Sequence, residues 1–167
     1  MPQMKSLSKT VFALYLLTLL WLVLFKFSFN ISTILSSYQS RSLNLIPFAS
    51  SSLRDILYNF VVFIPFGLLL SVNLRRTTIW RKLALIFALS LAVEITQFIL
   101  AIGSTDVTDV ITNTFGGFIG LTLYDLGNKH IDNEKLDKFI VATTMVLLIL
   151  FLLLRTLVFH VRYHSTH

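Results

Sequence analysis

The chain alternates between long apolar blocks and short polar segments. Each of its five apolar blocks has about 20 residues, the length of α-helix that crosses the hydrocarbon core of a membrane. The pattern therefore predicts an all-α, polytopic helical membrane protein with about five transmembrane helices, forming one membrane domain over residues 1–167. The predicted spans cover residues 9–29, 56–74, 83–102, 106–126 and 139–159.

The polar segments refine this prediction. The first apolar block is too long for the core of a signal peptide, and no A-x-A cleavage site follows it, so we expect a retained helix. Residues 30–54 are rich in serine and predict a loop between the first and second helices. Ser52 and Asp55 have the spacing of a helix-capping box. Pro65, inside the second block, is expected to kink or interrupt its helix.

Composition excludes several classes of protein. The chain is 55% apolar and 13% charged, whereas a soluble domain averages about 25% charged residues, so no separate soluble domain is expected. The absence of cysteine excludes disulfides and thiolate chemistry. The net charge of +6 does not indicate nucleic-acid binding, because the basic residues stand at the ends of apolar blocks, where they set membrane orientation.

The distribution of lysine and arginine predicts the orientation in the membrane. With the N-terminus in the cytoplasm, nine of the 14 basic residues fall on the inner side and five on the outer side. Adjacent short loops differ most, with four basic residues at 75–82 and none at 103–109. We therefore predict a multi-pass protein of the cell membrane, with its N-terminus inside, its C-terminus outside, and an extracytoplasmic loop between helices 1 and 2.

Ionisable and amide side chains gather where the third and fourth blocks meet. Glu94 and Gln97 lie one helical turn apart in the third block, and Asp106, Asp109 and Asn113 open the fourth. An Asp at the centre of a membrane helix costs roughly 2.5–3.5 kcal/mol on insertion scales, so ionisable residues persist there when they face a partner, water or a ligand. In the predicted orientation this set falls on the outer half of the membrane, together with Asn44, Asp55 and Asn59.

We interpret these residues as a polar cleft that opens away from the cytoplasm between the second, third and fourth helices. Glu94 is expected at its floor, about 12 Å below the end of its helix at roughly 1.5 Å per residue, and residues 44–54 form its lid. If the protein is an enzyme, the predicted catalytic residues are Glu94, Asp106 and Asp109. The predicted ligand-binding residues are Asn44, Asn59, Gln97 and Asn113.

Each of these residues also has a purely structural interpretation. Glu94 can pair with a polar residue of another helix, Gln97 can hydrogen-bond between helices, and Asp106 has the position of a helix N-cap. The Gly116-x-x-x-Gly120 spacing allows a neighbouring helix to approach closely. The residues that we expect to shape the backbone and the packing are Pro47, Phe48, Pro65, Gly67, Gly116, Gly117 and Gly120.

Taken together, these motifs resemble the VanZ-like family, which is named for a teicoplanin-resistance membrane protein. The resemblance covers residues 44–126 in order and spacing, and residues 139–159 are expected to form an additional C-terminal transmembrane helix. The matching motifs are Asn44-x-x-Pro47-Phe48, Asp55-x-x-x-Asn59, Phe63-x-Pro65-Phe66-Gly67, Glu94-x-x-Gln97 and Asp106-x-x-Asp109-x-x-x-Asn113-Thr114-x-Gly116-Gly117-x-x-Gly120.

The resemblance implies a small helical membrane protein of the bacterial cell envelope, linked to resistance against glycopeptides or other envelope-targeting agents. It supplies no settled chemistry. The chain departs from the family pattern at residues 101–105, where many members carry an arginine and this chain has none. It also has Thr108-Asp109 where some members have adjacent acids.

Four functions stay open at this point. We favour a binding protein whose cleft holds a lipid-linked cell-wall precursor or an envelope-targeting glycopeptide or lipopeptide. The alternatives are a membrane enzyme acting on a lipid or cell-wall intermediate, a small lipid transporter, and a structural partner in a homo-oligomer or larger membrane complex. No cofactor is expected, the one alternative being a divalent cation at Glu94, Asp106 and Asp109, because carboxylates suit hard cations. Membrane lipids are also predicted to contact the protein, and no binding to nucleic acid is expected.

Overall fold

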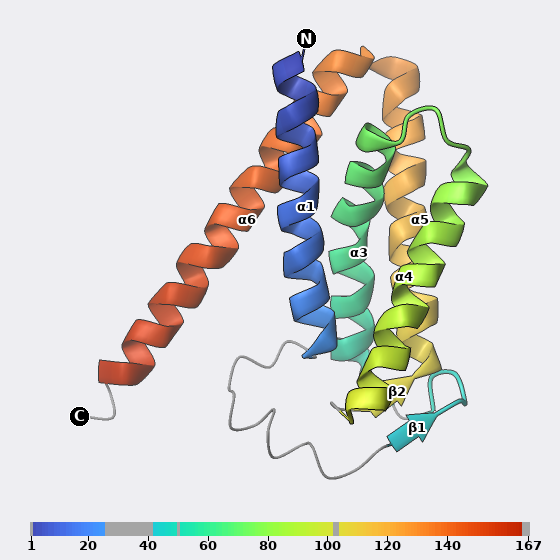
Figure 1. The fold of residues 1–167 in the computed structure, drawn as a ribbon, viewed down its shortest axis with the longest axis vertical. Helices are drawn as coiled ribbons and strands as arrows, with labels where there is room; N and C mark the ends of the chain where they lie inside the picture. Colours follow the sequence, from blue (N-terminus) through green and yellow to red (C-terminus); the bar gives the residue numbers. More distant parts are fainter. Residues whose placement is uncertain (1, 26–41, 50, 102–103, 165–167) are drawn as a thin grey trace.

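A computed structural model describes residues 2–25, 42–49, 51–101 and 104–164 of the chain as a packet of long helices (Figure 1). Successive helices run in opposite directions, so that the N-terminus and the C-terminal end of the last helix lie at opposite ends of the packet. The elements, in chain order, are α1 (Pro2–Leu24), β1 (Ser42–Asn44), α3 (Leu53–Asn73), α4 (Ile79–Leu100), β2 (Ser104–Asp106), α5 (Val107–His130) and α6 (Asn133–His164).

The predicted all-α helical architecture is confirmed. Within the described ranges α1, α3, α4 and α6 are long and apolar enough to cross a membrane. The fifth predicted span, α5, is as long as these helices but is interrupted by threonine, glycine and acidic residues. It runs beside α3 and α4 over the length of the packet (Figure 1).

The helices extend beyond the apolar blocks that predicted them. α5 continues to His130 and α6 begins at Asn133, so the gap between the predicted spans 106–126 and 139–159 is reduced to residues 131–132. An α-helix satisfies its own backbone hydrogen bonds and can therefore continue through polar residues at a membrane surface. Asp132 supports the start of α6, because its Oδ1 accepts hydrogen bonds from the backbone N–H groups of Glu134 and Lys135. The end of the predicted first span and most of the predicted 30–54 loop lie outside the described residues.

Local signals at the start of α3 were interpreted correctly, and of the two outcomes expected at Pro65, a kink or an interruption, only the interruption is excluded. Ser52 is the N-cap, and its hydroxyl accepts a hydrogen bond from the Asp55 backbone N–H, as the predicted capping box requires. The predicted interruption at Pro65 does not occur, since α3 is continuous from Leu53 to Asn73. One turn with a missing backbone hydrogen bond is tolerated in a membrane helix that neighbouring helices hold in place.

α3 and α5 pack backbone against backbone because glycines line their contact. A Cβ atom added to Gly116 would lie 2.1 Å from the carbonyl oxygen of Phe60, and one added to Gly120 would lie 2.2 Å from that of Ile64. Both distances are far inside van der Waals contact, so only glycine fits at these two positions. The predicted close approach of a helix at the Gly116-x-x-x-Gly120 motif is confirmed, and its partner is α3.

The remaining glycines of the motif complete this contact. A Cβ on Gly67 of α3 would lie 2.2 Å from the carbonyl oxygen of Gly117, and a Cβ on Gly117 would lie 2.7 Å from a methyl group of Ile86 on α4. α5 is thus held closely by α3 on one side and by α4 on another. Phe63, Leu69 and Leu121, all buried, fill the adjacent core.

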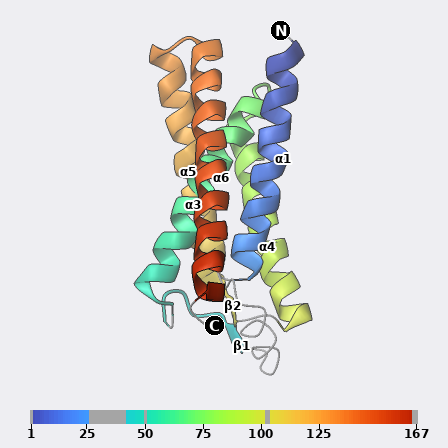
Figure 2. The ribbon, with the colours of Figure 1, turned by 90° about the vertical axis from the view of Figure 1, so that its left-hand side faces the viewer.

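α6 packs on α1 near its start and leans away from the packet toward its C-terminal end (Figures 1 and 2). Its apolar side chains beyond residue 144 are largely exposed, as expected for a helix face solvated by lipid tails rather than by protein. Arg155, in this part of α6, is charged and contacts α1: its guanidinium lies 5.2 Å from the ring centroid of Trp21, within the range of a cation–π interaction.

Two short parallel strands were not predicted. β1 pairs with β2 so that Asn44 lies opposite Asp106 in the register. With three residues each, the strands are too short to show the alternation by which a strand is identified in a sequence. Their pairing brings two motifs that are 62 residues apart in the chain into direct contact.

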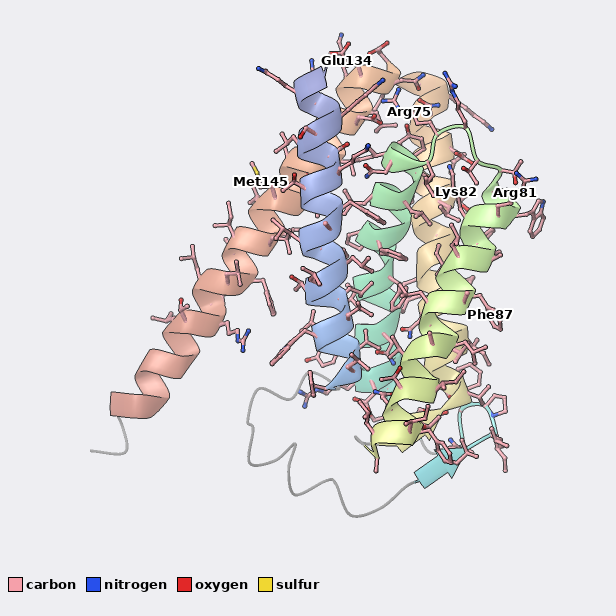
Figure 3. The ribbon with its side chains drawn as sticks, viewed as in Figure 1. Arg75, Arg81, Lys82, Phe87, Glu134 and Met145 are labelled. Atoms are coloured by element: carbon pink, nitrogen blue, oxygen red, sulfur yellow. The ribbon has the colours of Figure 1, made fainter. Side chains whose placement is uncertain are left out.

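The basic residues predicted on the inner side gather at one end of the packet, the end that holds the N-terminus. Figure 3 shows Arg75, Arg81 and Lys82 there. The alternation of the helices places the other six in the same region. The inside location of this end stays a prediction. The nine residues are Lys5, Lys9, Arg75, Arg76, Arg81, Lys82, Lys129, Lys135 and Lys138.

The glycine contact predicts the effect of a minimal substitution. Gly120→Ala should destabilise the protein by about 1–3 kcal/mol, the usual range for an overpacked core, because the new methyl group meets backbone atoms that cannot rotate away. Thermal unfolding of the purified protein in detergent measures the loss. Gly127→Ala is the matched control, since its Cβ would meet only the Leu136 side chain, at 3.3 Å. Equal losses in the two variants would contradict the prediction.

Candidate functional site

Most of the acidic and amide residues that the sequence singled out lie at the end of the packet where β1 and β2 pair (Figure 1). They come from β1, the C-terminal half of α4, β2 and the first two turns of α5. We call this set the polar seam. It consists of Asn44, Ser90, Glu94, Gln97, Asp106, Asp109 and Asn113, and its members on α4 and α5 are each less than a tenth exposed.

Asp106 is the junction of the polar seam. Its Oδ2 accepts hydrogen bonds from Asn44 Nδ2 at 3.1 Å and from Ser51 Oγ at 2.6 Å. Its Oδ1 accepts one from the Thr108 backbone N–H at 2.8 Å, which makes it the N-cap of α5. The predicted N-cap role is therefore confirmed, and the same carboxylate also ties the segment before α3 to α5.

The surroundings of Asp106 favour its charged form. Burial of the side chain raises the pKa of Asp106, but the hydrogen bonds from Ser51, Thr108 and Asn44 outweigh this effect, and the net result is a pKa below the ordinary value of 3.8. The group is therefore a carboxylate at neutral pH, and its oxygens are occupied by donors from the protein itself.

Glu94 is fixed to the beginning of α5. It is 2% exposed, and its Oε2 accepts a hydrogen bond of 2.8 Å from the backbone N–H of Asp106. The Thr105 hydroxyl donates a hydrogen bond of 3.4 Å to the backbone oxygen of Glu94. Glu94, Asp106 and Asn44 are thus joined by hydrogen bonds across α4, β2 and β1.

Asn113 joins α5 to α4 one turn further into the packet. Its Nδ2 donates a hydrogen bond of 2.9 Å to Ser90 Oγ, and both side chains have no measurable exposure. The Asn113 Oδ1 accepts no hydrogen bond from any residue that the structure describes. A buried acceptor in this state costs about 1–3 kcal/mol, so a donor that reaches it would be bound favourably.

Gln97 turns away from α5 and toward α1. Its Nε2 donates hydrogen bonds to the backbone oxygens of Val23, at 3.0 Å, and Leu24, at 3.2 Å. These carbonyls belong to the last turn of α1, where no intrahelical donor is available. The interhelical interpretation of Gln97 is therefore confirmed. Its Oε1 meets no hydrogen-bond donor among the described residues.

The two remaining predicted residues, Asp109 and Asn59, lie on α5 and α3. Asp109 lies in the first turn of α5 and is 4% exposed, and Asn59 lies on α3 and is 5% exposed. The acids and amides of the polar seam on α4 and α5, and Asn59 on α3, are thus buried, whereas Asp55 in the first turn of α3 is exposed. The outward-open cleft stays a prediction, because the described residues show a packed seam at this position.

The segment between β1 and α3 forms an exposed apolar surface beside the polar seam. We call it the apex, and it is attached to α5 by a hydrogen bond of 3.0 Å from the Phe48 backbone N–H to Thr108 Oγ1. Phe48 adopts a left-handed backbone conformation with φ of 62°, which is unfavourable for a bulky residue. Its ring is exposed, so Phe48 contributes here through its backbone. The apex consists of Leu43, Leu45, Ile46, Phe48 and Leu53, which are 53–71% exposed.

Sequence reasoning missed three residues of the site. Ser51, Thr108 and Ser90 each make a hydrogen bond to a predicted site residue or to the apex. Serine and threonine are too common for their presence to indicate a site. Ser90 nevertheless left a signal, because it is a polar residue in an apolar block, four positions before Glu94 and on the same helix face.

The predicted divalent-cation alternative finds no matching arrangement. Across residues 2–25, 42–49, 51–101 and 104–164, no group of three or more His, Cys, Asp and Glu side chains is placed to hold a metal ion. Glu94, Asp106 and Asp109 therefore do not form such a group, and Asp106 uses both of its oxygens to accept hydrogen bonds from the protein.

Comparison with known proteins agrees with the resemblance seen in the motifs. The family model VanZ/LLP1 matches residues 12–128, a range that contains the whole polar seam. The chain is 53% identical over 153 residues to Protein VanZ of Enterococcus faecium, and the match covers 91% of this chain and 94% of that protein. No solved structure matches the chain.

The hydrogen bonds of Asp106 predict an acid-dependent loss of stability. Because its pKa is lower in the folded than in the unfolded chain, its contribution is complete above pH 3.8 and is lost as the pH falls below that value. Thermal unfolding in detergent should show this decline in the native protein and a weaker one in Asp106→Asn. At neutral pH that variant should be less stable by about 1.5–3 kcal/mol, the value of a hydrogen bond to a charged group.

Asp132→Asn provides the control for this experiment, because it makes the same substitution at an exposed helix cap that asparagine can also serve. Its unfolding should follow that of the native protein at every pH. A decline in Asp106→Asn as steep as that of the native protein would show that other carboxyl groups cause it.

Proposed function

The chain belongs to the VanZ/LLP1 family and is a multi-pass membrane protein, and on this basis we propose that it binds an amphipathic ligand of the cell envelope. The ligand is a lipid-linked cell-wall precursor or an envelope-targeting glycopeptide such as teicoplanin, and its binding contributes to teicoplanin-type resistance. The observation that carries the proposal is the exposed apex, which hydrogen bonds from Asn44 and Ser51 attach to Asp106 of the polar seam.

The apex supplies apolar contact. Leu45 and Ile46 are 69% and 68% exposed. The segment stands at the end of the packet (Figure 1), just before the apolar span of α3 begins at Leu53. Contiguous exposed apolar side chains beside polar groups are typical of interaction sites. An acyl or polyprenyl chain that emerges from the membrane is a suitable partner for such a surface.

The polar seam supplies the second half of an amphipathic site. Asn44 and Ser51 join the two ends of the apex segment to the Asp106 carboxylate, so a ligand that moves the apex also acts on the seam. Asp109 and Glu94 can attract an ammonium group, and the amide oxygens of Gln97 and Asn113 suit the hydroxyl and N–H donors of sugars and peptides. Movement of the apex is the route by which a ligand would reach these buried groups.

The apolar half of the proposal is tested by Ile46→Ser. We expect the teicoplanin concentration that inhibits a susceptible host expressing this variant to fall about fivefold, equivalent to ~1 kcal/mol for partial burial of an isoleucine. The amount of protein in the membrane should not change, because the side chain is exposed. Ile131→Ser is the matched control, being an exposed isoleucine at the other end of the packet, and it should keep full resistance. An unchanged inhibitory concentration in Ile46→Ser would contradict the proposal.

The acidic half is tested by Asp109→Asn, which keeps the shape of the side chain and removes its charge. We expect this variant to lose the stabilisation that a lipid-linked precursor or teicoplanin gives to the purified native protein in a thermal-shift measurement, because the attraction for a cationic group is gone. Asp132→Asn, which removes an exposed charge elsewhere, should keep it. If the ligand stabilises Asp109→Asn as much as the native protein, then Asp109 has no part in binding.

A further inference from the structure

A cavity of about 800 Å³ lies at the other end of the packet from the polar seam. It is lined by the first turns of α1, the end of α3 with the connection between α3 and α4, and the start of α6, and it is open on one side. Arg75 and Glu134, two of its lining residues, are labelled at this end in Figure 3. Its charged lining consists of Lys5, Lys9, Arg75, Arg76, Glu134 and Asp137.

Both acids of the lining are already compensated. Asp137 is 7% exposed, forms an ion pair with Arg75, and accepts a hydrogen bond of 2.9 Å from the hydroxyl of Tyr124. Glu134 pairs with Lys138, one turn further along α6, at 2.8 Å. These contacts hold α6 against α5 and the α3–α4 connection, and they leave little negative charge directed into the cavity.

Three cations of the lining are left over. In the part of the chain that the structure describes, Lys5, Lys9 and Arg76 form no ion pair. Lys5 and Lys9 are one turn apart on α1, and Arg76 approaches from the α3–α4 connection, so the three charges reach the cavity from two different elements. A requirement for membrane orientation explains positive charge at this end, but it does not require that the charges surround a common cavity.

The uncharged lining is polar at one part and apolar at another. Ser8 Oγ donates a hydrogen bond of 3.2 Å to Asn73 Oδ1 between α1 and α3. Met4, Val72 and Leu74 supply the apolar part. The apolar block of α1 begins only after the polar run at residues 3–9, and the span of α3 ends at Asn73, which places the cavity at the depth of lipid headgroups.

We propose that this cavity binds a phosphate-bearing anion, supplied by the headgroup of an anionic phospholipid. Lysine and arginine are the side chains that bind phosphate, arginine through paired N–H donors. The surplus of positive charge selects an anion, and the apolar part of the lining accommodates the first carbons of the lipid chains. The site is separate from the apex and the polar seam, and it stands whether or not the proposed envelope ligand is correct.

The unmodified, full-length protein provides the first test. In detergent, phosphatidylglycerol or cardiolipin should raise the unfolding temperature, and phosphatidylcholine, which has no net charge, should not. Inorganic phosphate and glycerol phosphate form separate arms: stabilisation by these alone would assign the site to a free phosphate compound, and stabilisation by the lipids alone to a headgroup. If phosphatidylcholine stabilises as much as phosphatidylglycerol, and the phosphate compounds do nothing, the proposal is wrong.

Matched variants separate the cavity from the general charge of this end. We expect Lys5→Gln/Lys9→Gln/Arg76→Gln to bind phosphatidylglycerol about 100-fold more weakly, taking about fivefold for each cation removed near an anionic surface. Arg81→Gln/Lys129→Gln/Lys135→Gln removes the same charge from the same end, outside the cavity lining, and should bind within a few-fold of the native protein. Equal losses in the two triple variants would show a diffuse surface effect and overturn the proposal.

Discussion

The approach of α3 to α5 without intervening side chains is the constraint on which the rest of the structure depends. At Gly116 and Gly120 a single added carbon would lie well within the van der Waals contact distance of an α3 carbonyl oxygen. In a membrane, where burial of apolar surface gives little drive for helices to associate, such close backbone packing is a main source of attraction. It also sets the position of α5, and therefore the depth and direction of every polar side chain that α5 carries.

The polar seam follows from that position. With α5 against α3, the Asp106 carboxylate lies where the segment leading into α3 can reach it, and Asn113 lies against Ser90 of α4. A carboxylate in such a place is tolerated because donors surround it, and the same donors fasten the apex to the helices. One set of hydrogen bonds therefore stabilises a buried acid and fixes an exposed apolar surface beside it. This coupling is the structural basis for assigning the two to a single ligand site.

The two ends of the packet differ in chemistry. One end combines acids, amides and exposed apolar residues. The other combines a cavity with lysine and arginine side chains that form no ion pair with any residue in the described part of the chain. This division follows from the alternation of helix direction, because residues near the start of one helix and the end of the preceding one must lie on the same side. The two sites that we propose therefore lie at opposite ends of the packet, separated by the length of its membrane-spanning helices.

The sequence by itself determined the features that depend on a residue and its immediate neighbours. The helices were predictable because transfer of an apolar block into lipid depends on composition and length, and the caps at Ser52 and Asp106 because they involve groups two or three residues away. Only the tertiary structure decided which partners meet across the packet: Asn44 with Asp106, Gln97 with the last turn of α1, Arg75 with Asp137. These contacts depend on how the helices are placed in space. Small residues such as Gly67 and Gly117 determine that placement, but the sequence around them does not indicate which helix each will contact.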